Sequence, residues 1–127
     1  MDRTIIVRKK ETDNYQIENI LNKNFGENRH QRTVYLYRKK SPIKGLSLVS
    51  CLNEDSNTVI GTITFYRTLV SNINCLLLGP LAVSALFQGK GFGKILVRKG
   101  LEIAKQKNEA LCFVSGKYDY YKEFDIF

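Results

Sequence analysis

A glycine-rich turn between an apolar stretch and a helical one is the part of the sequence best suited to binding a ligand. It runs from Gln88 to Lys94 and reads QGKGFGK. Glycine adopts positive φ angles at no steric cost, and no side chain shields its backbone N–H group. The helix expected after the turn adds unpaired N–H groups and the positive end of its dipole. This combination favours the binding of an anion, most naturally a phosphate or pyrophosphate.

The spacing of the glycines excludes two common phosphate-binding loops. A Walker loop needs Ser or Thr after its Gly-Lys pair to hold magnesium, whereas Ile95 follows Gly93-Lys94 here. The dinucleotide pattern G-x-G-x-x-G fails because its third glycine comes one residue too early. The pattern that remains is Q-x-x-G-x-G, formed by Gln88, Gly91 and Gly93.

The turn, together with its flanking segments, resembles the acetyl-CoA pyrophosphate loop of the GNAT superfamily of N-acetyltransferases. An apolar LGPLAV stretch precedes the turn and a basic amphipathic segment follows it. Four further segments look, in this order, like a bacterial subfamily of small predicted acetyltransferases: Phe25–Lys39, Gly45–Ser50, Val59–Tyr66 and Tyr120–Phe127. The resemblance therefore spans nearly the whole chain.

The resemblance implies that acetyl-CoA is the co-substrate and that the amine of an acceptor attacks its thioester directly. The pyrophosphate would be held by residues of the turn, namely Gln88, Gly89, Lys90, Gly91, Phe92, Gly93 and Lys94. Backbone groups of Leu81, Ala82 and Val83 would bind the pantetheine arm and polarise the thioester carbonyl. No metal ion is expected, because the three cysteines lie far apart and His30 has no ligand-like neighbour.

Tyr121 matches the position of a tyrosine that, in many GNAT enzymes, gives a proton to the departing CoA thiolate. The alternative is that Tyr118, Tyr120 and Tyr121 only pack a helix against the sheet. No general base stands out, since nothing in the spacing of Glu27 or Glu54 selects either of them. The identity of the acceptor amine is left open.

The end of the sequence gives a second expectation. Family members continue past the helix that holds Tyr121 into two more strands, whereas only Ile126 and Phe127 follow Asp125 here. The resemblance thus implies a single domain over residues 1–127 that lacks the final two strands. A second copy of the chain could cover the sheet edge that this leaves open, which would make a homodimer. The alternative function is a non-catalytic or degenerate CoA-binding module of the same fold.

The charge distribution agrees with a polyanionic ligand. The net charge is +8, yet Arg67 is the only basic residue between Gly45 and Gly89. Six basic residues crowd the turn and the segment after it: Lys90, Lys94, Arg98, Lys99, Lys105 and Lys107. They would steer CoA electrostatically, although a solvated helix face has the same pattern. Nucleic-acid binding ranks lower because no nucleic-acid motif accompanies the charge. A cytoplasmic protein is expected, since no apolar run is long enough for a membrane span or a signal peptide.

The elements that must position these groups form an α+β fold with α/β/α layers. Its expected sheet is mixed and mostly antiparallel. Strands are expected at Thr4–Arg8, Leu46–Leu52, Thr58–Leu69, Ile73–Val83 and Leu111–Val114, and helices at Asn14–Phe25, Arg29–Lys39, Phe92–Asn108 and Tyr118–Phe124. Strict alternation places Val59, Ile63 and Phe65 on one face. The last strand should run parallel to Ile73–Val83, and Gly79-Pro80 should mark the start of an opening between the two.

Overall fold

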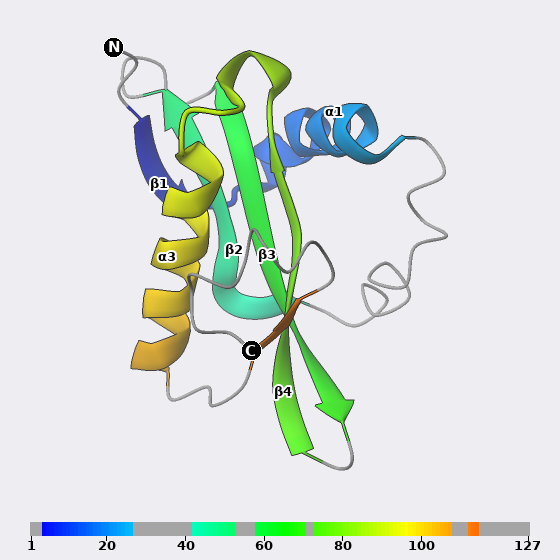
Figure 1. The fold of residues 1–127 in the computed structure, drawn as a ribbon, viewed down its shortest axis with the longest axis vertical. Coiled ribbons are helices and arrows are strands. Elements are labelled where there is room, and N and C mark those ends of the chain that lie inside the picture. The colour runs from blue at the N-terminus through cyan, green and yellow to red at the C-terminus, as the bar shows by residue number, and fades with distance from the viewer. Residues whose placement is uncertain (1–3, 27–41, 53–57, 71–72, 108–111, 115–127) are drawn as a thin grey trace.

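The computed structural model describes residues 4–26, 42–52, 58–70, 73–107 and 112–114, and within them a five-stranded sheet forms the centre (Figure 1). Its spatial order follows the sequence: β1 (Thr4–Arg8), β2 (Pro42–Leu52), β3 (Val59–Val70), β4 (Ile73–Val83) and β5 (Cys112–Val114). The first four strands pair antiparallel, and β5 pairs parallel to β4. The mixed, mostly antiparallel sheet is confirmed.

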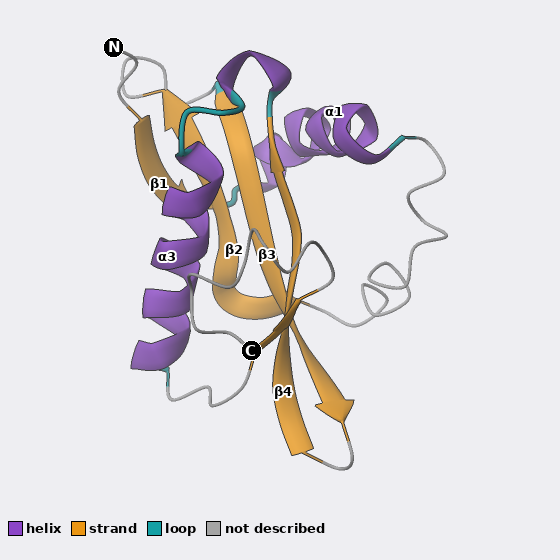
Figure 2. Cartoon of the chain, viewed as in Figure 1, coloured by secondary structure: helices purple, strands orange, loops and turns teal. Residues whose placement is uncertain are grey.

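Two helices cover opposite faces of this sheet and complete three layers (Figure 2). One face is covered by α1 (Asn14–Phe25), which buries Ile17, Ile20 and Leu21 against it. The other is covered by α3 (Phe92–Gln106), whose Leu96, Val97 and Ala104 join the larger core cluster around Phe65. Both helices place apolar residues three and four positions apart, which gives each a single apolar stripe. The predicted layers are therefore confirmed.

The contact between α3 and β3 is so close that it requires glycine. A Cβ atom added at Gly100 would overlap the aromatic ring of Phe65, which is itself fully buried. The absence of a side chain lets the helix axis approach the sheet, and this compensates for the low helix propensity of glycine. The starting residue of α3 agrees with the sequence prediction, and its last residue, Gln106, lies two positions earlier than predicted.

Two strand details differ from the prediction. First, β2 begins at Pro42, four residues earlier than expected, and the backbone bends between Pro42 and Ser47 where its pairing with β3 shifts register. Second, the placement of Val59 beside Ile63 and Phe65 was wrong. Ile60 is an extra residue between the pairs Gly61↔Ser50 and Val59↔Cys51, and this bulge turns Val59 onto the face covered by α1.

A second bulge lies in β4 at Gly79-Pro80, a cis peptide bond. These two residues stand opposite Thr64 alone, between the pairs Phe65↔Leu78 and Ile63↔Leu81. Directly before this bulge, β5 pairs with Leu76, Leu77 and Leu78. The bulge therefore coincides with the last β4 residue that pairs with a described residue of β5. The helices expected at Arg29–Lys39 and Tyr118–Phe124 lie outside the described residues, and the absence of two final strands stays a prediction.

Candidate functional site

The candidate site lies where β4 ends and the chain turns into α3. A short 3-10 helix, η3 (Ala85–Phe87), follows β4, and the turn then leads to the first residue of α3 (Figure 2). Gly89 has a φ angle of 77° and Gly91, which caps α3, has a φ angle of 87°. Residues with a Cβ atom rarely adopt these angles. The backbone path of the turn thus explains the glycines at positions 89 and 91.

The N-terminus of α3 presents backbone donors. The N–H group of Ile95 donates to the carbonyl oxygen of Gly91 at 3.2 Å, and this is the first bond of the helix. The N–H groups of Gly91, Phe92 and Gly93 come earlier, so no carbonyl within the helix can accept from them. The first turn contains no acidic side chain, and Gly89 and Gly91 have open space where a Cβ atom would lie. A small anion can approach this backbone closely.

The last residues of β4 offer a second set of backbone groups. The N–H group of Ser84 donates to the carbonyl oxygen of Ile60 in β3 at 2.7 Å. Because backbone groups alternate sides along a strand, Ala82 also faces β3, while Leu81 and Val83 face the opposite edge. In the described part of the chain, β5 pairs with β4 only at Leu76–Leu78. Of the three predicted pantetheine-binding residues, the structure therefore brings Leu81 and Val83 to this edge, but not the backbone of Ala82.

A small hydrogen-bond network ties the turn to both β4 and α1. The side-chain nitrogen Nε2 of Gln88 donates to the carbonyl oxygen of Val83 at 2.9 Å and to Oδ1 of Asn24 at 3.0 Å. Nδ2 of Asn24 donates to the same Val83 oxygen at 3.1 Å and to the carbonyl oxygen of Ile20 at 2.8 Å. The side-chain nitrogen of Gln88 is thus directed back at the protein. Sequence reasoning missed Asn24, because a polar residue in the last turn of a helix carries no signal of a partner 64 positions away.

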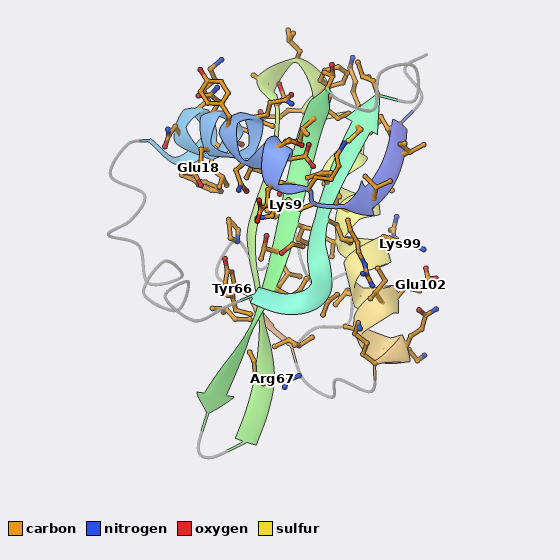
Figure 3. The ribbon with its side chains drawn as sticks, turned by 180° about the vertical axis from the view of Figure 1, so that it is seen from behind. Lys9, Glu18, Tyr66, Arg67, Lys99 and Glu102 are labelled. Carbon is orange, nitrogen blue, oxygen red and sulfur yellow. The ribbon has the colours of Figure 1, made fainter. Side chains whose placement is uncertain are left out.

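Basic side chains lie at this N-terminus and along α3. Lys90 is exposed, and its Nζ atom lies 5.8 Å from the centre of the Phe87 ring, which in turn contacts the Phe92 ring edge-on. Further along α3, Arg98 and Lys105 are exposed, and Lys99 lies 3.7 Å from Glu102 on the outer surface of the helix (Figure 3). Glu102 is the only acidic residue of α3. The field at the turn therefore favours an anion.

Several predicted features fall outside what the structure describes. Tyr121, the predicted proton donor, is among them, as are Glu27 and Glu54. Within the described ranges, no three His, Cys, Asp or Glu side chains are grouped in a way that could hold a metal ion. None of the described helices is long and apolar enough to cross a membrane.

Comparison with known proteins shows what this chain is similar to in sequence and in fold. The sequence profile of the acetyltransferase (GNAT) family matches residues 14–119, a range that includes the turn and the end of β4. A GNAT N-acetyltransferase of Escherichia coli (YhbS), solved in complex with CoA, has a TM-score of 0.82 and 25% identity, covering 98% of this chain and 68% of its own. No curated protein sequence matches the chain significantly.

Two further solved structures share the fold. A GNAT acetyltransferase of Brucella melitensis in complex with acetyl-CoA has a TM-score of 0.77 and 24% identity, covering 96% of this chain and 81% of its own. An acetyltransferase of Trypanosoma brucei has a TM-score of 0.72 and 13% identity. The match covers 96% of this chain and 91% of the T. brucei chain. Since the family profile spans most of the sequence and the fold agrees, the chain belongs to the acetyltransferase (GNAT) family.

Proposed function

We propose that this protein is an N-acetyltransferase that transfers an acetyl group from acetyl-CoA to a primary amine. One observation carries the proposal: among the described residues, β5 does not pair with β4 at Leu81 and Val83, and this stretch of β4 leads through the turn to the N-terminus of α3. CoA consists of an amide-rich arm joined to a pyrophosphate, and these two backbone surfaces follow one another in the same order. The E. coli and B. melitensis neighbours, solved with CoA and acetyl-CoA, support this choice of ligand.

The turn and the end of β4 would each bind a different part of acetyl-CoA. The N–H groups from Gly89 to Lys94 would receive the pyrophosphate, with Lys90 adding positive charge from its exposed side chain. The amides of the pantetheine arm would bond to Leu81 and Val83 much as an added strand bonds to a sheet edge. Gln88 would contribute its backbone, because its side-chain nitrogen already donates to Val83 and Asn24.

The reaction would proceed by direct transfer. The lone pair of a neutral amine attacks the thioester carbon, and the oxygen that becomes negative is stabilised by a β4 N–H group at the open edge. The C–S bond then breaks, the amine nitrogen gives up a proton to solvent, and the CoA thiolate takes a proton from the Tyr121 hydroxyl. The Tyr121 phenolate then regains a proton from solvent, which restores the starting state. Holding both reactants at fixed positions supplies a large part of the rate enhancement.

The first test is a calorimetric titration of the full chain with acetyl-CoA, with light scattering in the same buffer. We expect saturable binding at one acetyl-CoA per chain, and turnover when a panel of small amines and peptides is added. A dimer would support a shared sheet edge. Binding with no turnover for any amine would instead make the protein a CoA-binding module, and no binding by a folded sample would refute the proposal.

The Tyr121→Phe variant tests the proton donor. We expect it to bind acetyl-CoA with unchanged Kd and to lower kcat by about 10²-fold or more, which is the typical contribution of a positioned general acid. Tyr118→Phe is the matched control, because it removes the same hydroxyl from a neighbouring tyrosine. Equal kcat values for Tyr121→Phe and the parent chain would remove Tyr121 from the mechanism.

A further inference from the structure

We propose that Asn24 is a positioning residue for the acetyl-CoA site, an inference that rests on the function proposed above. Asn24 lies in the last turn of α1, on the opposite face of the sheet from α3. Its side-chain amide nevertheless bonds to Gln88 in the turn and to Val83 at the end of β4. Asn24 therefore links the two proposed binding surfaces, the turn and the end of β4.

The network fixes the last peptide group of β4 from both sides. Its N–H group, from Ser84, donates to Ile60 in β3, while its carbonyl oxygen, from Val83, accepts from both Asn24 and Gln88. A carbonyl oxygen has two lone pairs, and both are used here. Consequently the Val83 carbonyl oxygen has no lone pair left to accept a hydrogen bond from a ligand. The groups left at this edge are the N–H of Val83 and the backbone of Leu81.

The orientation of the Asn24 amide follows from its partners. Nδ2 faces two carbonyl oxygens, those of Ile20 and Val83, and Oδ1 faces the Nε2 donor of Gln88. A carboxylate at this position would set a negatively charged oxygen against two acceptors. Asn24→Asp therefore keeps the shape of the side chain but replaces the donor Nδ2 with an acceptor oxygen. The variant thus tests the hydrogen bonds of Asn24 separately from its packing.

The variants are compared by calorimetric titration of the full chain with acetyl-CoA. We expect Asn24→Asp to raise Kd about tenfold, the equivalent of 1.4 kcal/mol, while the binding stoichiometry stays the same. The stoichiometry counts folded molecules, so a purely structural role would lower it and leave Kd unchanged. The matched control is Asn14→Asp, which makes the same change at the first residue of α1, where the side chain accepts from Lys9. It should bind within about twofold of the parent chain.

The Asn24→Ala and Gln88→Ala variants and their double variant test whether the two side chains act through one network. We expect the double variant to lose little more affinity than the worse single variant, because either change breaks the same hydrogen-bond network around the Val83 carbonyl. Fully additive losses would overturn the shared network. An unchanged Kd for Asn24→Asp would overturn the positioning role.

Hydrogen exchange without ligand separates this inference from the proposed function. Asn24→Asp should accelerate exchange of the Ser84 amide and of the turn amides from Gly89 to Gly93, and Asn14→Asp should not. Unchanged exchange would refute the ordering role of Asn24, whatever the ligand. If the parent chain fails to bind acetyl-CoA, the proposed function falls and the positioning role falls with it.

Discussion

Both halves of β4 contain buried apolar side chains, but the halves differ in backbone pairing. Before the bulge, Leu76 and Leu78 are each 1% exposed, and their strand pairs with β3 on one side and β5 on the other. After the bulge, Ala82 is 3% and Val83 is 9% exposed, and the strand still pairs with β3. In the described part of the chain, however, no residue of β5 pairs with this second half.

We interpret the first half of β4 as a structural half and the second as the proposed binding half, and one extra residue separates the two. Hydrophobicity cannot distinguish the halves, since both bury apolar side chains. The extra residue at Gly79-Pro80 interrupts the regular ladder where the described pairing with β5 stops. Beyond it, the backbone of Leu81 and the N–H group of Val83 face away from β3. Ligand binding in the second half should accordingly depend on backbone groups more than on side-chain identity.

The largest expected loss of binding comes from Gly91→Val. Gly91 has a φ angle of 87°, where a β-branched residue carries a strain of about 1–3 kcal/mol. Its methyl groups would also occupy the open space above the helix N-terminus. We expect the acetyl-CoA Kd to rise at least about 100-fold, or roughly 2.7 kcal/mol, in a calorimetric titration. A Kd within about threefold of the parent value would show that the pyrophosphate does not lie on this turn.

A proline pair probes the second half of β4 directly. Val83→Pro removes an N–H group that faces the open edge, whereas Ala82→Pro removes one that faces β3. We expect Val83→Pro to raise the acetyl-CoA Kd about tenfold, the effect of one lost charge-stabilising or amide hydrogen bond. Ala82→Pro should cost more in thermal stability, because it removes a ladder bond. If both variants lose equal stability and equal affinity, the division of the strand into edge and ladder residues is wrong.

The sequence was sufficient for features that depend on local residue patterns. The bounds of α1, the start of α3 and the parallel pairing of β5 with β4 follow from helical spacing, from the glycine turn and from the handedness of crossover connections. The requirement for glycine at Gly91 is equally local, because its positive φ angle restricts the residue type at the position itself.

Features that depend on register or on distant contacts could not be predicted. The bulge at Ile60 moved Val59 to the other face, although nothing in the apolar run around it distinguishes a bulge from regular alternation. That the backbone of Ala82 faces β3, while Leu81 and Val83 face the other edge, also required the register of β4 against β3. Asn24 was missed for the same reason, since its partners in space are set by how α1 lies on the sheet.

Gly100→Ala tests the structural half without touching the binding half. The added methyl group would overlap the ring of Phe65, whose residue pairs with Leu78 just before the β4 bulge. We expect a loss of about 1–3 kcal/mol in the free energy of unfolding, measured by urea denaturation, and an unchanged acetyl-CoA Kd for the folded protein. The double variant Gly100→Ala, Phe65→Leu should recover part of the stability. A stable Gly100→Ala protein would contradict the close packing of α3 on β3, and this variant also controls for lost stability in Gly91→Val.

The smallest effect should come from Lys90→Ala, which removes charge and leaves the backbone donors of the binding half in place. Lys90 is exposed, so water and salt screen its attraction for a phosphate. We expect the acetyl-CoA Kd to rise about two- to threefold in about 0.05 M salt, and this difference to vanish near 1 M salt, where the Debye length is about 3 Å. Lys105→Ala removes the same charge about 20 Å further along α3 and should change little. Equal effects of the two variants would mean that net charge alone attracts the ligand, whereas a salt-independent loss for Lys90→Ala would point to a contact through its stem and the Phe87 ring.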